Sequence, residues 1–87
     1  MDINMETTIK NDEICIGYNI KRIRKSKGMK QLQLVEKLQL RDVHISREIL
    51  GQIERGVHHI TATQLRAIKE ILDTTYEELF KRSDEAV

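Results

Sequence analysis

Apolar residues recur along this chain at intervals of three and four, which is the spacing of helices that bury one face. Ile16, Ile20 and Ile23 share one such face, and Gly28 follows as a stop signal. We therefore expect a first helix over residues 12–27. Cys15 borders this apolar stripe, so it is interpreted as a small core residue.

A second helix is predicted to start near Lys30 or Gln31. Leu34, Val35 and Leu38 would form its buried face. The segment LQLRDVHI that follows lacks a clear helical period and is interpreted as a linker.

Capping signals predict two further helices in the last third of the chain. Thr61 with Gln64, and Thr75 with Glu78, each have the spacing of a capping box, in which two side chains satisfy the first backbone N–H groups of a helix. The residues expected to point inward are Leu65, Ile68, Ile71 and Leu72 on the fourth helix, and Leu79 and Phe80 on the fifth.

The third helix lies between Ser46, a good N-cap, and Gly56, a good C-terminal stop. On a wheel at 100° per residue, one arc is apolar and holds Ile49, Leu50 and Ile53. The opposite arc holds Arg47, Glu48, Gly51, Gln52 and Arg55.

That polar arc has the chemistry of a surface that reads base edges. Arginine pairs with guanine, a carboxylate accepts from cytosine, and an amide pairs with adenine. Gly51 costs about 1 kcal/mol relative to alanine in a helix interior, and on an open face it would allow a partner to approach the backbone closely. The alternative interpretation is an ordinary solvent-exposed helix face.

Composition agrees with one small helical domain. The 87 residues include no proline, four glycines and 33% charged residues. No apolar run approaches the roughly 18 residues of a membrane span, and Met1–Lys10 lacks the features of a secretory signal. A single cysteine excludes an internal disulfide and is consistent with a reducing cytoplasm.

The net charge is only +1, but the charge is segregated along the chain. Residues 1–16 contain four acids and one lysine, residues 38–59 are balanced, and residues 60–87 contain six acids and four bases. Residues 17–37 contain one acid and seven bases: Lys21, Arg22, Arg24, Lys25, Lys27, Lys30 and Lys37. This basic block is either a solvated helix face or part of an electrostatic surface for an anionic partner.

The chemistry of a metal centre is weakly represented. His58 and His59 could ligate a metal with His44 or Cys15, but adjacent histidines lack the spacing of known metal sites. We therefore expect no metal and no cofactor.

An enzyme is also not expected. Glu48 and Glu54 could be interpreted as a catalytic carboxylate pair, but they lie well apart around the helix. The chain has no phosphate-binding glycine loop and no nucleophile motif.

The segments IKRIRKSKGMKQ, IERG and LDTTYEELF, in this order and spacing, resemble the Cro and phage-repressor type of helix-turn-helix domain, the Xre-like family. The resemblance covers residues 16–80. It implies an all-α, compact, lambda-repressor-like domain of five helices, whose second and third helices form the helix-turn-helix. We expect this domain over residues 12–82, with terminal tails at 1–11 and 83–87.

The resemblance also implies roles for individual residues. A recognition helix over about 46–55 would enter the major groove. The residues expected to contact bases are Arg47, Glu48 and Gln52. The residues expected to contact the DNA backbone are Lys30, Gln31, Ser46, Gly51, Arg55, His58 and His59. Arg24 and Glu54 match paired family positions and border apolar stripes, so they are expected to form a structural ion pair.

Two features depart from the family pattern. Lys30 stands where the family often has threonine or serine, and lysine cannot N-cap a helix but can reach a phosphate. The link between the second and third helices is about five residues longer than the tight turn of the phage repressors, with residues 41–45 filling it.

These observations favour a cytoplasmic, bacterial or phage-type regulator acting at the nucleoid, which binds double-stranded DNA as a homodimer on a palindromic operator and represses transcription. The alternative is a protein-interaction module, such as an antitoxin that masks another protein. It would use an exposed apolar patch, at Val57 and Ile60 or at the end of the fifth helix.

Overall fold

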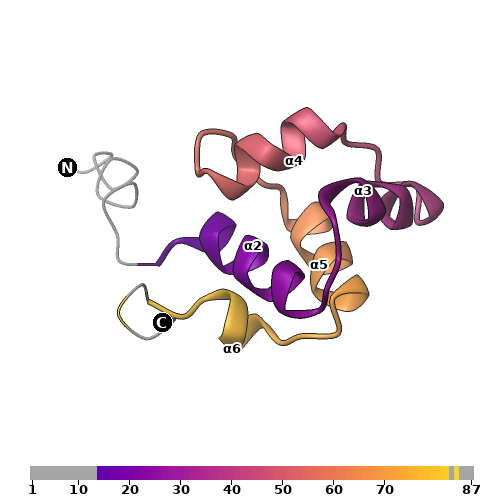
Figure 1. Ribbon diagram of the computed structural model, residues 1–87. Helices are drawn as coiled ribbons and strands as arrows, with labels where there is room; N and C mark the ends of the chain where they lie inside the picture. Colours follow the sequence, from indigo (N-terminus) through magenta and orange to yellow (C-terminus); the bar gives the residue numbers. More distant parts are fainter. Residues whose placement is uncertain (1–13, 83, 85–87) are drawn as a thin grey trace.

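The computed structural model describes residues 14–82 and residue 84. Its helices are α2 (Ile16–Ser26), α3 (Gln31–Leu40), α4 (Arg47–Glu54), α5 (Ala62–Ile71) and α6 (Tyr76–Leu79) (Figure 1). The five-helix, all-α prediction is confirmed for these residues. The predicted tail over 1–11, and residues 83 and 85–87 of the C-terminal tail, lie outside the described residues.

The start of α2 differs from the prediction. The helix begins at Ile16, whereas Ile14 is extended and forms an isolated antiparallel bridge with Arg82. Cys15 is the N-cap residue of α2 and is exposed, so its interpretation as a core residue is wrong. Residues 14 and 15, which the prediction includes in the helix, therefore precede it.

The four longer helices all end in the same way, in a Schellman turn whose first residue past the cap has a positive φ. Gly28 and Gly56 occupy this position with φ of 70° and 80°, which confirms both predicted stops. Asp42 and Asp73 occupy it with φ of 64° and 54° at the ends of α3 and α5. Aspartate tolerates this conformation better than most residues, and it is a weaker signal in the sequence than glycine.

The predicted N-caps are present. The Oγ of Ser46 accepts from the N–H of Ile49 at 3.0 Å, and Thr61 and Gln64 exchange two hydrogen bonds, 3.1 and 3.0 Å long. The Oγ1 of Thr75 accepts from the Glu78 N–H at 3.1 Å. The Glu78 carboxylate would complete a full capping box by accepting from the Thr75 N–H. It instead lies 3.1 Å from the Lys81 ammonium, in an ion pair.

The core is entirely aliphatic. Its buried members are Ile20, Ile23, Leu34, Leu38, Leu50, Ile53, Ala67, Ile68, Leu72 and Leu79. Leu79 is fully buried, as predicted, but Phe80 is 42% exposed, so its predicted inward direction is wrong. Phe80 is the C-cap of α6 and lies beside Tyr76, one turn earlier, with ring centroids 6.1 Å apart.

The long link between α3 and α4 is tied to the core. Val43 and Ile45 are half-buried against it, and the Val43 N–H donates to the Leu38 carbonyl at 2.9 Å. The additional residues therefore contribute packing immediately before the Ser46 cap. These contacts fix the position of the link before α4 begins.

α2 and α4 approach each other so closely that only glycine fits between them. A Cβ at Gly17 would lie 1.9 Å from the Ile53 carbonyl oxygen and 3.0 Å from that of Glu54. Both obstacles are backbone atoms, which cannot rotate aside as a side chain can. Gly17 therefore sets the distance between the first helix and the end of α4.

Gly17→Ala should lower the free energy of unfolding by about 3 kcal/mol or more, because the added methyl group must separate two helices. Gly51→Ala is the matched control within a helix. A Cβ there would meet its nearest neighbours at 3.6 Å, an ordinary contact, so the free energy of unfolding should rise by up to about 1 kcal/mol. Thermal and urea unfolding would measure both. Equal effects of the two substitutions would contradict the close approach at Gly17.

Candidate nucleic-acid interface

α4 lies at the edge of the molecule (Figure 1). Its apolar side is held by Leu50 and Ile53, which are 0% and 2% exposed. Arg47 and Glu48 are exposed, and Gln52 is half-buried. The structure therefore places the three residues expected to contact bases on one eight-residue helix, outside its packed side.

Gly51 differs from the helical-wheel prediction, which put it on the open face. It is buried, because the side chains of Gln31 and Arg55 extend over it. The Arg55 Nη1 and the Gln31 Nε2 each lie 3.6 Å from the position of a Cβ on Gly51. Two side chains that carry hydrogen-bond donors therefore lie over this glycine.

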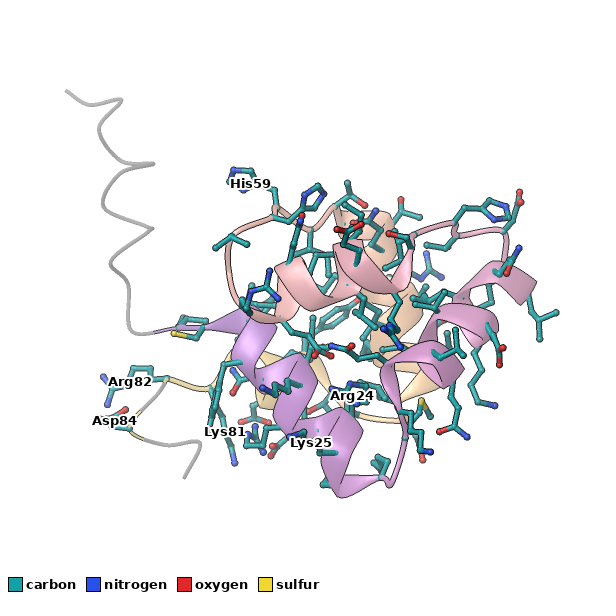
Figure 2. The ribbon with its side chains drawn as sticks, turned by 45° about the horizontal axis from the view of Figure 1, so that its top comes forward. Arg24, Lys25, His59, Lys81, Arg82 and Asp84 are labelled. Atoms are coloured by element: carbon teal, nitrogen blue, oxygen red, sulfur yellow. The ribbon has the colours of Figure 1, made fainter. Side chains whose placement is uncertain are left out.

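Arg24 and Glu54 form a buried, bidentate ion pair. The Nε and Nη2 of Arg24 donate to the two carboxylate oxygens of Glu54 at 2.7 and 3.0 Å. The remaining Nη1 donates to the Met29 carbonyl at 2.8 Å. Both residues are nearly inaccessible to solvent, at 5% and 6% exposed, and Arg24 lies within the body of the protein in Figure 2.

Gln31 connects the start of α3 to the end of α4. Its Nε2 donates to the Glu54 Oε1 at 2.9 Å. Because Glu54 is itself held by Arg24, the orientation of the Gln31 amide is fixed by a buried partner. The same amide nitrogen has a second N–H, which can donate to another acceptor.

The first turn of α3 also carries Lys30, which is exposed and stands at the N-cap position. Its side chain has no acceptor, but the Gln33 Oε1 accepts from the Lys30 backbone N–H at 2.7 Å. This contribution of Gln33 was not predicted, and its signal was a glutamine at the third helical position. At the N-terminus of α4, the hydroxyl of the exposed residue Ser46 caps the helix by accepting from the Ile49 N–H.

The predicted histidines are exposed on loops. His58 and His59 follow α4, and His59 projects from its loop in Figure 2. His44 lies in the α3–α4 link, with its Nε2 2.9 Å from the Asp42 Oδ1. In residues 14–82 and 84, no three potential metal ligands lie close enough together to hold an ion.

A second cluster of charges, between α3 and α5, is partly neutralised, because two arginines share one carboxylate. Glu70 is paired with Arg41 and lies 3.3 Å from the Nε of Arg66. The hydrogen bond from Arg41, followed by that from Arg66, holds the pKa of the Glu70 carboxyl below its usual value. These two arginines are therefore less available to an anionic partner than Arg47 or Arg55.

Comparison with known families gives one result. A family model described as helix-turn-helix matches residues 20–79, which include all of α3, α4, α5 and α6. No match was found among curated proteins or solved structures. Among the described residues, no helix is both long and apolar enough to cross a membrane.

Removing either partner of the Arg24–Glu54 pair should be strongly destabilising, because a buried charge is left uncompensated. Arg24→Met and Glu54→Gln should each lower the free energy of unfolding by roughly 3–5 kcal/mol. The double variant should lose less than the sum of the two single losses, which is the signature of coupling. Arg55→Ala is the control, because this arginine is adjacent in sequence but exposed. Strictly additive losses for the first two substitutions would exclude an energetic coupling.

Proposed function

The chain belongs to the helix-turn-helix family of DNA-binding proteins, and from this premise we propose that it is a sequence-specific binder of duplex DNA that represses transcription. The observation that carries the proposal is the face of α4, where Arg47, Glu48 and Gln52 are accessible beside one another. An α-helix fits the major groove of B-DNA, and these three side chains provide the donors and acceptors that distinguish base pairs there.

In this proposal the backbone contacts surround the base contacts. The side chains of Gln31 and Arg55 carry N–H donors beside Gly51, where together they would contact one phosphate. Lys30 and Ser46 stand at the N-termini of α3 and α4, where backbone N–H groups favour an anion. His58 and His59 extend the same contact set along the loop beyond α4.

The operator is expected to have the two-fold symmetry of a dimer. A two-fold dimer would read a palindrome whose half-sites lie about 34 Å apart, one helical turn of DNA. A domain seated on such a site would repress by occluding it.

Selection of bound duplexes from a random pool tests the function directly. A palindromic motif is expected. No enrichment of any sequence would favour the alternative, a module that binds another protein through exposed apolar side chains such as Val57, which is 69% exposed.

Gln52→Ala should weaken binding to the best selected site by about 1–3 kcal/mol and relax the base preference at one position in each half-site. Unfolding should change little, because the side chain is not part of the core. Gln39→Ala, at an exposed glutamine of α3, is the matched control and should leave binding unchanged. An unaltered affinity and base preference for Gln52→Ala would remove this residue from the reading face.

Arg55→Ala should weaken binding to all sequences similarly and reduce the slope of log affinity against log salt by about one unit, as expected for one lost phosphate contact. Titrations at several salt concentrations measure that slope. Arg66→Ala removes another exposed arginine, one already paired with Glu70, and should leave the slope unchanged. A wild-type slope for Arg55→Ala would contradict the proposed phosphate contact.

A further inference from the structure

The link between α3 and α4 holds its exposed side chains in a fixed direction. Exposure alternates along it: Val43 and Ile45 are half-buried against the core, whereas His44 and Ser46 are exposed. This alternation is the pattern of an extended segment with one side on the core, in which residues two apart point to the same side. His44 therefore lies on the same side of the link as Ser46.

This side of the link lies next to the proposed DNA site. In a helix-turn-helix one helix crosses the DNA backbone and the next enters the major groove, so the segment between them passes the edge of the groove. The link leads directly into the N-terminus of α4 (Figure 1). Ser46 at that N-terminus is one of the proposed backbone contacts, so His44 would lie beside a phosphate as well.

His44 has the chemistry of a phosphate contact, and it is held by a group that opposes one. Its Nε2 lies 2.9 Å from the Asp42 Oδ1, and the two side chains are 61% and 93% exposed. A ring N–H can donate to this carboxylate or to a phosphate, whereas the carboxylate itself repels a phosphate. Asp42 would therefore compete with DNA for His44 and repel the backbone at the same place.

The negative charge of Asp42 is not required by the fold. This residue has a φ of 64° at the end of α3, in the left-handed region that both aspartate and asparagine tolerate. An uncharged asparagine would serve this turn equally well. Within the part of the chain that the structure describes, Asp42 forms no ion pair with a lysine or an arginine.

We infer that His44 and Asp42 set the affinity for DNA at the edge of the interface: His44 contacts a backbone phosphate, and Asp42 weakens that contact. The inference rests on the proposed function and adds to it a contact from the long link. Phosphate contacts carry no sequence information. This pair therefore changes the affinity for every duplex and leaves the preferred sequence as it is.

Duplexes that carry one uncharged methylphosphonate at a time test the contact of His44. Each is a version of the best selected site, and its affinity for the full chain is measured with wild type and with His44→Ala. At one position the methylphosphonate should weaken wild type roughly three- to tenfold but leave His44→Ala unaffected. Gln39→Ala, at an exposed residue of α3, should retain the loss. Equal losses for wild type and His44→Ala at every position would overturn the phosphate contact.

Asp42→Asn tests the opposing charge. It should raise the affinity for all duplexes several-fold and leave the selected sequence unchanged, because a like charge is removed from beside the backbone. The gain should be smaller when His44 is alanine, because part of it comes from releasing the histidine. An unchanged affinity, or an equal gain in both backgrounds, would overturn the competition for His44.

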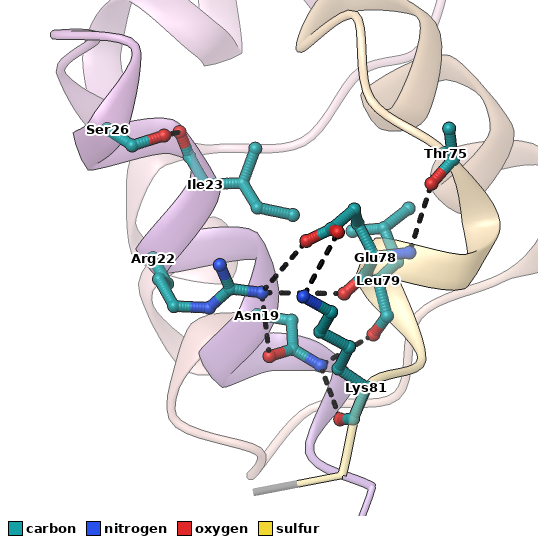
Figure 3. Close-up of polar contacts among 8 residues, drawn as sticks. All are labelled: Asn19, Arg22, Ile23, Ser26, Thr75, Glu78, Leu79 and Lys81. Carbon is teal, nitrogen blue, oxygen red and sulfur yellow. Dashed lines mark hydrogen bonds and ion pairs between the residues drawn. The ribbon is translucent and has the colours of Figure 1, made fainter. Parts of the chain in front are cut away.

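Asp73→Asn is the matched control for this substitution. Asp73 has a φ of 54° at the end of α5, and its turn leads to Thr75, the N-cap of α6 (Figure 3). α6 and α4 lie on opposite sides of α2 (Figure 1). At about 0.15 M salt, where charges are screened beyond roughly 8 Å, Asp73→Asn should leave the affinity unchanged. A gain equal to that of Asp42→Asn would show a general effect of net charge and overturn the local role of Asp42.

The same experiments distinguish this inference from the proposed function. Thermal unfolding should show that the variants are folded, because His44, Asp42 and Asp73 are all exposed. If wild type binds a selected duplex while the methylphosphonate and Asp42→Asn experiments show no effect, the inference alone is overturned. A wild type that binds no duplex would overturn the proposed function and, with it, the inference.

Discussion

The buried pair of Arg24 and Glu54 is the interaction on which the arrangement of the three helices around the candidate interface depends. Two charges removed from water require nearly complete hydrogen bonding to be tolerated. Arg24 meets that requirement with Glu54 and the Met29 carbonyl, and Glu54 accepts a further bond from Gln31. α2, the turn after it, the start of α3 and the end of α4 are therefore joined at one point.

The buried Arg24–Glu54 pair also positions side chains at the protein surface. The hydrogen bond to Glu54 orients the side chain of Gln31. Arg55 is the C-cap residue of α4 and directly follows Glu54. Gly17 allows α2 to lie against the carbonyls at that end, which brings Arg24 within reach. The close contact at Gly17 and the buried ion pair thus position Gln31 and Arg55, the two side chains that are proposed to contact a DNA phosphate.

On the other side of α2, α6 is also held in place by the hydrogen bonds of a buried polar side chain (Figure 3). A single buried amide, that of Asn19, satisfies two carbonyl groups at the end of a helix too short to be stable alone. The exposed rings of Tyr76 and Phe80 are held on this anchored turn.

The sequence by itself determined that there are five helices, the Ser46, Thr61 and Thr75 caps, and the Gly28 and Gly56 stops, because periodicity and capping are local properties of a chain. It also determined which side of α4 is apolar. Only the tertiary structure decided that Gly17, and not Gly51, is the glycine of close approach, and that Cys15 and Phe80 face solvent. Each of these depends on a neighbour that is distant in sequence or on where a helix starts. A helical wheel describes one helix and contains no information about what packs against it.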